Sequence, residues 1–181
     1  MATKRTLSRS LLYFLVFLGV LVTLYGAAYF RMLQVSEKYW IQGSMSFSQG
    51  NFAWALKGAR KTKSDGSGYE FWGGFQQVVE IWSSPFAWPR PDLYGRAQEQ
   101  IRVLIEQKLD AESGLAIFQK YYQKDKRYLD AVLSRVATLD VQAGRLDEAR
   151  KVLQTLIEYF PNDPETVAGA EKRLKALEGN P

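Results

Sequence analysis

The dominant pattern in the chain is an unbroken run of hydrophobic residues close to the N-terminus. Residues 11–30 read LLYFLVFLGVLVTLYGAAYF, which is 20 residues without a charged side chain. As an α-helix this run would extend for about 30 Å, which matches the hydrocarbon core of a bilayer. Tyr25 and Tyr29 fall near its end, and tyrosine is favoured at the membrane interface. The pattern therefore predicts a transmembrane anchor over residues 11–32.

A cleaved signal peptide is the alternative interpretation of the same run. Gly26, Ala27 and Ala28 are small residues of the kind that a signal peptidase requires. The hydrophobic part of a signal peptide normally has about 7–15 residues, however, and this run continues past the small residues. The length thus favours an uncleaved anchor.

The charges on either side of the run predict its orientation. Lys4, Arg5 and Arg9 precede it, and no acidic residue occurs before Glu37. By the positive-inside rule, residues 1–10 form a basic cytoplasmic tail of a single-pass protein of the inner (plasma) membrane. Residues 33–181 are then expected in the periplasm or another extracytoplasmic space. The basic, acid-free N-terminus also fits a mitochondrial protein, and this alternative stays open.

Beyond residue 33, hydrophobic residues recur at the spacing of one face of an α-helix, without the sustained alternation that is typical of strands. Prolines and most glycines fall between these periodic segments. Helices are predicted over residues 36–48, 52–63, 70–83, 92–109, 112–124, 128–143, 146–160 and 164–177. Short helices paired through tight turns predict an all-α array of helical hairpins.

Three residues define the clearest hairpin, at about residues 130–163. Gly144 permits a tight turn, Ala149 allows two helices to approach closely, and Pro161 prevents the second helix from continuing. Together with the leucines at positions 146, 153 and 156, they resemble a tetratricopeptide repeat. This resemblance implies a superhelical array whose concave surface binds segments of other proteins.

An earlier stretch carries the same signature, and a middle one carries it weakly. Gly43, Gly50, Phe52 and Ala55 occupy the matching positions of a hairpin at about residues 36–69. A third hairpin, at about residues 96–129, has helical periodicity but lacks the glycine and alanine in phase. Residues 164–177 are expected to form a capping helix.

The spacing of the repeats predicts an aromatic-rich insertion over residues 70–95. Two repeats of about 34 residues leave about 26 residues unexplained between Gly50 and Gly144. Within this stretch Phe71, Phe75, Val78 and Trp82 form an apolar helical stripe, which is expected to pack against the hairpins. The proline-rich segment PFAWPRP follows and presents Phe86 and Trp88, for which intramolecular packing, a partner protein and the membrane interface are all open.

The composition excludes several classes of function. There is no cysteine and no histidine, so neither a disulfide nor a zinc, copper or haem site with these ligands is possible, and no cofactor is expected. Without the residues at positions 4, 5, 9 and 31, the chain keeps 20 basic against 19 acidic residues. Nucleic acid is therefore not an expected partner. Asp147 with Glu148, and Asp163 with Glu165, are interpreted as helix caps.

Two groups of residues are candidates for binding. Partner contacts are expected from large aromatic side chains, namely Phe86, Trp88, Trp72, Trp82, Trp40 and Phe47. The resemblance places Trp40, Ser44 and Phe47 on the concave surface in the first repeat, and Ser134, Thr138 and Gln142 in the last. A basic group, Lys57, Arg60, Lys61 and Lys63, is either a solvated helix end or a contact for anionic lipid headgroups or an acidic partner.

These features favour a membrane-anchored, non-catalytic protein-interaction scaffold, an accessory or assembly subunit of a membrane complex. Its expected partners are the lipid bilayer and other subunits of that complex, or a protein or peptide ligand. The alternative is a membrane-anchored receptor or chaperone that grips peptides or secreted substrates in its concave groove. A carboxylate-dependent cell-wall hydrolase would need a pair of acids in a cleft.

Overall fold

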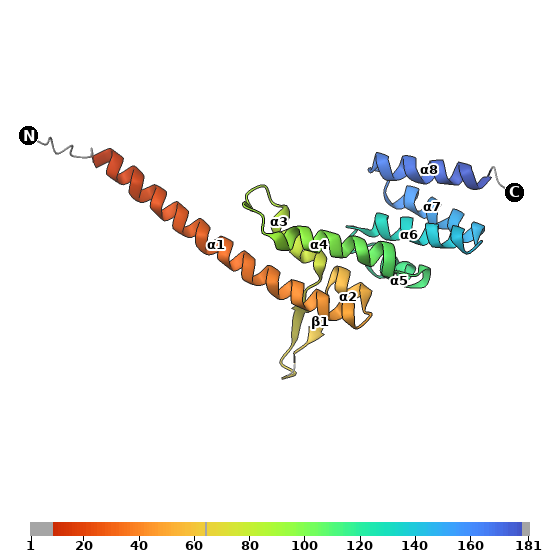
Figure 1. The fold of residues 1–181 in the computed structure, drawn as a ribbon, viewed down its shortest axis with the longest axis horizontal. Helices are drawn as coiled ribbons and strands as arrows, with labels where there is room; N and C mark the ends of the chain where they lie inside the picture. The colour runs from red at the N-terminus through yellow and green to blue at the C-terminus, as the bar shows by residue number, and fades with distance from the viewer. Residues whose placement is uncertain (1–8, 64, 179–181) are drawn as a thin grey trace, which may run out of the picture.

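The protein is almost entirely helical, and the all-α fold class is confirmed (Figure 1). The structure is a computed structural model that describes residues 9–63 and 65–178, so Lys4, Arg5 and most of the predicted basic tail lie outside the described residues. The elements in chain order are α1 (Arg9–Ser48), α2 (Phe52–Lys57), β1 (Ala59–Thr62), β2 (Tyr69–Trp72), α3 (Phe75–Ser83), α4 (Asp92–Val103), the π-helical turn η1 (Leu104–Lys108), α5 (Ala111–Tyr121), α6 (Leu129–Gln142), α7 (Leu146–Tyr159) and α8 (Pro164–Glu178).

Helix α1 is a single helix of 40 residues and does not break where the anchor was expected to give way to the domain. Its N-terminal half carries the hydrophobic run, whose side chains are exposed. Its C-terminal part packs against α2, α3 and α4, and Ser36, Gln42, Gly43 and Ser46 are buried there. Because the hydrophobic run and the first helix of the domain are one element, the two are joined without a hinge.

The predicted helix over residues 52–63 was wrong beyond Lys57, and the helix predicted from residue 70 begins only at Phe75. Between them β1 and β2 form an antiparallel hairpin, with Ala59 opposite Trp72 and Thr62 opposite Tyr69. Gly58 ends α2 at a φ of 68°, and a Cβ atom there would lie 2.6 Å from the carbonyl oxygen of Trp72. The strand pairing therefore requires glycine at the position where the helix was expected to continue.

Helix α3 is part of the core, as the apolar stripe predicted for Phe75, Val78 and Trp82. The inclusion of Phe71 in that stripe was wrong, because Phe71 lies in β2 and is 44% exposed. Helix α3 packs against α1 and α4, and Phe75, Val78 and Trp82 are fully buried. Gly43 on α1 lies against α3, where a Cβ atom would be 3.1 Å from the ring of Phe75. Within the predicted insertion, α3 therefore packs into the fold against α1 and α4, whereas the loop that follows it exposes Phe86 and Trp88.

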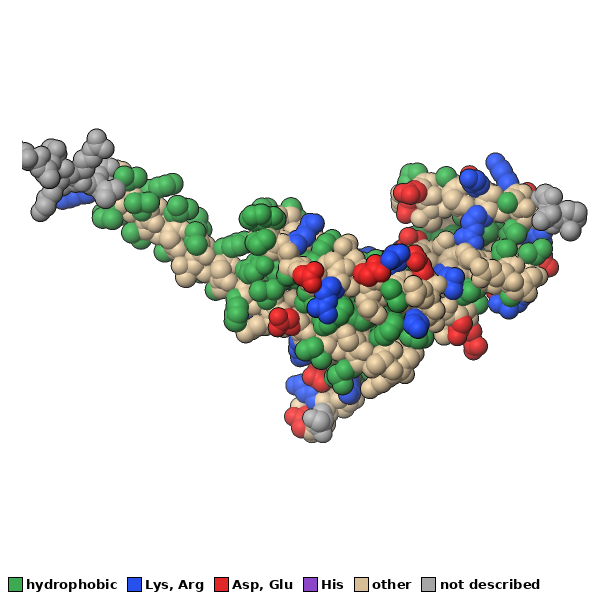
Figure 2. Space-filling view, in the orientation of Figure 1, with side chains coloured by type: hydrophobic (Ala, Val, Ile, Leu, Met, Phe, Trp, Pro, Cys, Tyr) green, Lys and Arg blue, Asp and Glu red, His purple; other side chains and the backbone are tan. Residues whose placement is uncertain are grey.

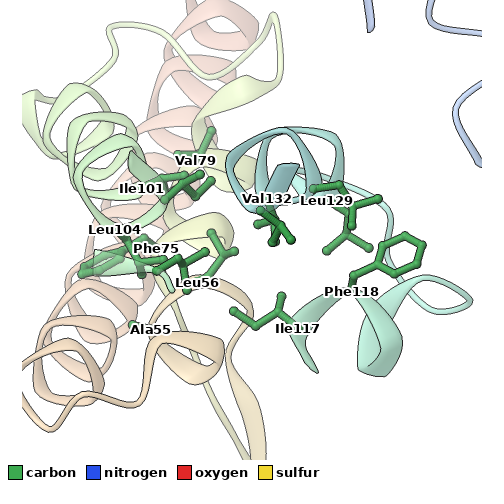
Figure 3. Close-up of a cluster of buried hydrophobic side chains, with 14 of the residues drawn as sticks. Ala55, Leu56, Phe75, Val79, Ile101, Leu104, Ile117, Phe118, Leu129 and Val132 are labelled. Atoms are coloured by element: carbon green, nitrogen blue, oxygen red, sulfur yellow. The ribbon is translucent and has the colours of Figure 1, made fainter. Parts of the chain in front are cut away.

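A continuous cluster of buried hydrophobic side chains joins the two ends of the domain (Figure 3). Leu56 and Phe75 lie near Leu104 from η1, and the cluster continues to Ile117 and Val132. Helices α5, α6, α7 and α8 pack in sequence, each on the next, as a helical array requires (Figure 1). Gly144 makes the α6–α7 turn at a φ of 72°, as expected.

Gly114 supplies the small residue that the middle repeat was expected to lack. It lies in α5 where α5 crosses α6, and a Cβ atom there would collide with the side chain of Val136. Ala149, on α7, is the equivalent small residue about one repeat later and is also fully buried. Gly114 was not recognised in the sequence because the tetratricopeptide signature has alanine at this position. Both residues are small enough to let two helices pack closely.

Replacing Gly114 with alanine is expected to destabilise the domain by about 1–3 kcal/mol, because the added methyl group forces Val136 to move. Gly95 provides the matched control. It also lies inside a helix but has open space around it, so Gly95→Ala is expected to stabilise the domain by about 0.4–1 kcal/mol. Urea unfolding of the full chain in detergent micelles, followed by far-UV circular dichroism, measures both. A stabilising Gly114→Ala would show that α5 and α6 are not in close contact.

Candidate interaction surfaces

A groove runs along the face of the domain that α4, η1, α6 and α8 form. A hollow of about 460 Å³ lies between α4–η1 and α6, and one of about 420 Å³ lies between α6 and α8. Ala131 and Ser134 line both hollows, which therefore meet on α6. The helices that form this face are the first helices of successive pairs, which is where the resemblance placed a concave binding surface.

Polar contacts cross the second hollow, between α8 and α6. Arg173 from α8 reaches across to α6, where it donates hydrogen bonds to the carbonyl oxygen of Ser134 (3.2 Å), to Ser134 Oγ (3.0 Å) and to Thr138 Oγ1 (3.0 Å). Burial lowers the pKa of the Arg173 guanidinium. Ser134 and Thr138 thus lie in the groove as expected, whereas Gln142 is exposed at the end of α6 and is not among its lining residues.

Two arginines in the groove have no acidic partner among the residues that the structure describes. Arg135 lines the first hollow, and its Nε atom is buried without a hydrogen-bond acceptor. Arg173 is bound only by hydroxyl and carbonyl oxygens. Arg102 differs, because it pairs with Glu99 at 2.7 Å and with Glu106 at 3.7 Å. The sequence did not single out Arg135 or Arg173, because single arginines on helices give no local signal.

Asp163, at the edge of the groove, acts as a helix cap. Asp163 accepts hydrogen bonds from the backbone N–H of Thr166 (3.1 Å) and from its hydroxyl group (2.9 Å). These hydrogen bonds lower the pKa of Asp163, whereas a general acid needs a raised pKa. Glu165 lies in the first turn of α8, and Asp147 and Glu148 lie in the first turn of α7. Capping is therefore confirmed for Asp163, whereas Asp147 accepts a hydrogen bond from Arg150 (2.7 Å) instead of a backbone N–H group. The first-turn positions of Glu148 and Glu165 suit the helix dipole.

A second surface is the segment from Ser84 to Pro91, called here the aromatic loop. Phe86 is 83% exposed and Trp88 is 74% exposed, whereas Ala87 between them is buried. The backbone of the loop is held by α1. Tyr25 donates hydrogen bonds from its hydroxyl group to the carbonyl oxygens of Phe86 (3.0 Å) and Trp88, and Tyr29 donates one to the carbonyl oxygen of Pro89 (2.9 Å).

The other aromatic candidates are parts of the core or of its edge. Trp82 is fully buried, with Tyr29 packed edge-on at 5.3 Å between ring centroids, so its prediction as a partner-binding residue was wrong. Trp72 is half-buried, and its Nε1–H group is shared between the carbonyl oxygen of Gln42 and Ser46 Oγ, both at 3.2 Å. Its position in β2 leaves one ring face for Lys61, whose Nζ atom lies 4.4 Å from the ring centroid.

Trp40 and Phe47 from α1 pack mainly within the fold. The ring of Phe47 contacts Phe52 at 5.8 Å and Phe75 at 6.3 Å between centroids. Trp40 contacts Phe75 at 5.2 Å, and the guanidinium of Arg96 lies 4.7 Å from its ring. Trp40 also lines a hollow of about 370 Å³ between α1 and α4. Trp40 remains half-exposed at this edge of the domain. Phe47 instead packs between α1 and the helices α2 and α3.

Lys57 is buried, which overturns its placement in a lipid-binding or partner-binding patch. Its Nζ atom lies 3.5 Å from Asp125 Oδ2 and donates hydrogen bonds to the backbone carbonyl oxygens of Asp125 and Arg127. Burial lowers the pKa of Lys57 to about 8, although the nearby carboxylate of Asp125 opposes this effect. Lys57 therefore joins α2 to the turn before α6.

Arg60, Lys61 and Lys63 remain exposed on the β-hairpin. The hairpin contacts α1 near Gln42, which is about 18 Å further along the helix than the end of the hydrophobic run. The three cations thus lie well away from the part of α1 that is suited to a bilayer. Among the described residues, α1 alone is long and apolar enough to cross a membrane, a test that a signal sequence also passes.

The fold and the groove define an all-α repeat protein with a surface suited to protein segments. Residues 104–176, from η1 to α8, match the family model described as Tetratricopeptide repeat. The match includes the middle hairpin that seemed weakest and leaves out the stretch at residues 36–69, whose second helix is cut short by the β-hairpin. Such repeats typically act as non-catalytic modules for protein interaction. No curated protein and no solved structure matches the chain.

Proposed function

We propose that this protein is a membrane-anchored scaffold that holds a segment of a partner protein in its groove, as an accessory or assembly subunit of a membrane complex. The observation that carries the proposal is the groove itself, on a face that tetratricopeptide repeats use for protein contacts. Catalysis is not part of this role. Among the described residues, no cluster of three or more His, Cys, Asp or Glu side chains is placed to hold a metal ion.

Two arginines of the groove favour an acidic partner segment, although Glu106, Asp130, Asp163 and Glu165 also line the hollows. Arg135 and Arg173 lack an acidic partner among the described residues, and both are partly removed from water. Because a carboxylate forms paired hydrogen bonds with a guanidinium group, an Asp, a Glu or a C-terminal carboxylate would relieve this deficit. A polypeptide is expected to lie across Ala131 and Ser134, where the two hollows meet.

The anchor in this proposal is the N-terminal half of α1. Its large hydrophobic side chains are exposed over residues 11–25, and lipid would cover them. The cations at positions 4, 5 and 9 favour a cytoplasmic N-terminus, with the groove on the other side of the membrane, in the periplasm or its equivalent. The exposed cations of the β-hairpin would then face an acidic partner instead of lipid headgroups.

A receptor or chaperone is the second candidate function, and the two unpaired arginines are the observation that favours it. Stable association at fixed stoichiometry would support a complex subunit. Peptide binding in the micromolar range that weakens with salt would support a receptor, because exposed charge pairs are screened.

Filling the groove tests both candidates. Ala131→Trp places a large side chain where the hollows meet, and the partner that co-purifies with the tagged full chain from mild-detergent membranes is expected to be lost. Ala116→Trp is the matched control, because Ala116 is exposed on α5 and is not among the groove residues. If the full chain carries no partner, or if the partner survives Ala131→Trp, the groove is not its binding site.

A further inference from the structure

Phe86 and Trp88 are the most exposed large apolar side chains of the described residues. They stand outward on either side of Ala87, which is buried, and the peptide bond between Trp88 and Pro89 is cis. Exposed aromatic rings are costly in water unless another surface covers them. The geometry of the loop indicates which surface this is.

The aromatic loop is held against the end of the hydrophobic run of α1. Its carbonyl oxygens accept hydrogen bonds from Tyr25 and Tyr29, which lie in the last two turns of residues 11–30. Arg90 fixes the other side of the loop, since its Nε atom donates a hydrogen bond to the carbonyl oxygen of Trp82 (3.0 Å). The loop is thus tied at both ends and not free to turn its rings inward.

The level of this attachment along α1 corresponds to a bilayer interface. Tyr25 lies about 21 Å from Leu11 along the helix, and Tyr29 about 27 Å, so both fall near one boundary of a hydrocarbon core of about 30 Å. Tryptophan and tyrosine are favoured at this depth, because one end of the ring is apolar and the other meets water.

The aromatic loop and the hydrophobic run of α1 share an uncharged, apolar surface. Residues 81–89 contain no charged side chain, and the next charges on the two segments are Arg90 and Arg31. Figure 2 shows hydrophobic side chains along the N-terminal half of α1 and again over the neighbouring loop between α3 and α4. Both arginines directly follow the uncharged stretches, at the level where lipid phosphates would lie.

We propose that the aromatic loop is a second membrane contact, with Phe86 and Trp88 inserted into the bilayer interface beside α1. This inference rests on the proposed membrane anchoring of α1. The occupant of this surface is lipid, not a partner protein. The loop and α1 together fix which side of the domain faces the membrane, whereas α1 alone would leave the domain free to rotate about the helix axis.

Single-cysteine variants test the depth of the loop, because the natural chain has no cysteine. Phe86→Cys and Trp88→Cys each keep the other aromatic residue. Leu18→Cys reports on the hydrophobic run, and Tyr69→Cys is the matched control, since Tyr69 is 73% exposed at the β-hairpin. Each variant of the full chain carries a nitroxide label in vesicles of phosphatidylcholine and phosphatidylglycerol. Power-saturation electron paramagnetic resonance then measures collisions with oxygen and with a water-soluble nickel chelate.

Labels at positions 86 and 88 are expected to collide with the nickel chelate several-fold less often than the label at position 69, and the label at position 18 least of all. If position 18 is protected but positions 86 and 88 match position 69, the inference is wrong and the loop is free for a partner protein, while the anchor stands. If position 18 is as accessible as position 69, the proposed anchoring fails and the inference fails with it.

Discussion

Trp82→Ala is expected to lower the free energy of unfolding of the domain by about 3–5 kcal/mol. Trp82 is the largest of the fully buried side chains, and it projects from α3 onto the ring of Tyr29 on α1. Its removal leaves a cavity that neighbouring helices cannot fill, because α3 is fixed between α1 and α4. Urea unfolding of the full chain in detergent micelles, followed by far-UV circular dichroism, measures this loss.

Two controls separate the cavity from other effects. Trp88→Ala removes the same atoms from an exposed position and is expected to change stability by less than about 0.5 kcal/mol. Trp82→Phe keeps most of the bulk and removes an indole N–H that is buried without an acceptor, so its cost is expected to be small. Equal losses for Trp82→Ala and Trp88→Ala would mean that the aromatic loop belongs to the core.

Asp125→Ala is the second change with a large expected effect, a destabilisation of about 3–5 kcal/mol. Asp125 accepts a hydrogen bond from Gln76 and is the acidic partner of Lys57, whose side chain is only 1% exposed. Burial alone would raise the pKa of Asp125, but hydrogen bonds from Gln76 and Arg127, with the charge of Lys57, hold it below its ordinary value. Without the carboxylate, the buried ammonium group of Lys57 would lose its salt-bridge partner.

The pH dependence of stability tests this account of Lys57. In the folded protein the pKa of Lys57 is about 8, against an ordinary value of 10.5 for a lysine side chain. Between these values the unfolded chain binds more protons, so the free energy of unfolding rises with pH, by up to about 3 kcal/mol from this group. The contribution is present in full above pH 10.5 and is lost as the pH falls through about 8. Lys57→Met removes the titrating group. The difference in unfolding free energy between the wild type and this variant then reports on Lys57, because the contributions of the other titrating groups cancel.

The expected result is a stability difference, wild type minus Lys57→Met, that increases between pH 8 and pH 10.5. A difference that stays constant over this window would show that Lys57 is solvated. Lys57 would then belong to the exposed basic group with Arg60, Lys61 and Lys63, as the sequence first indicated.

Local signals were enough to predict the C-terminal helices from the sequence. Residues 128–143, 146–160 and 164–177 were expected to be helical, and α6, α7 and α8 agree within two residues at each end. Gly144 and Pro161 mark the boundaries by backbone geometry alone, which does not depend on the rest of the fold. The long hydrophobic run of α1 was equally plain, although its continuation without a break to Ser48 was not.

The parts that were missed depend on contacts between distant residues. The β-hairpin exists because residues 59–62 pair with residues 69–72, and a search for helical spacing does not detect such pairing. Lys57 looked like one cation among four, since its partner Asp125 lies far along the chain. The location of the groove on the first helices of the repeats was expected. Its two arginines without an acidic partner among the described residues, Arg135 on α6 and Arg173 on α8, were not, because these helices come together only when the array is packed.

The unbroken helix α1 has a mechanical consequence. A helix of 40 residues is about 60 Å long, and under the proposed anchoring roughly half of it stands in the bilayer. Transmembrane helices tilt by about 20° on average, and a rigid rod passes that tilt on to whatever is fixed to its far end. The far end of α1 would then be displaced sideways by about 10 Å. In thicker and thinner membranes the same protein would present its groove at different heights and angles, so that bilayer thickness would help to select which partners it reaches.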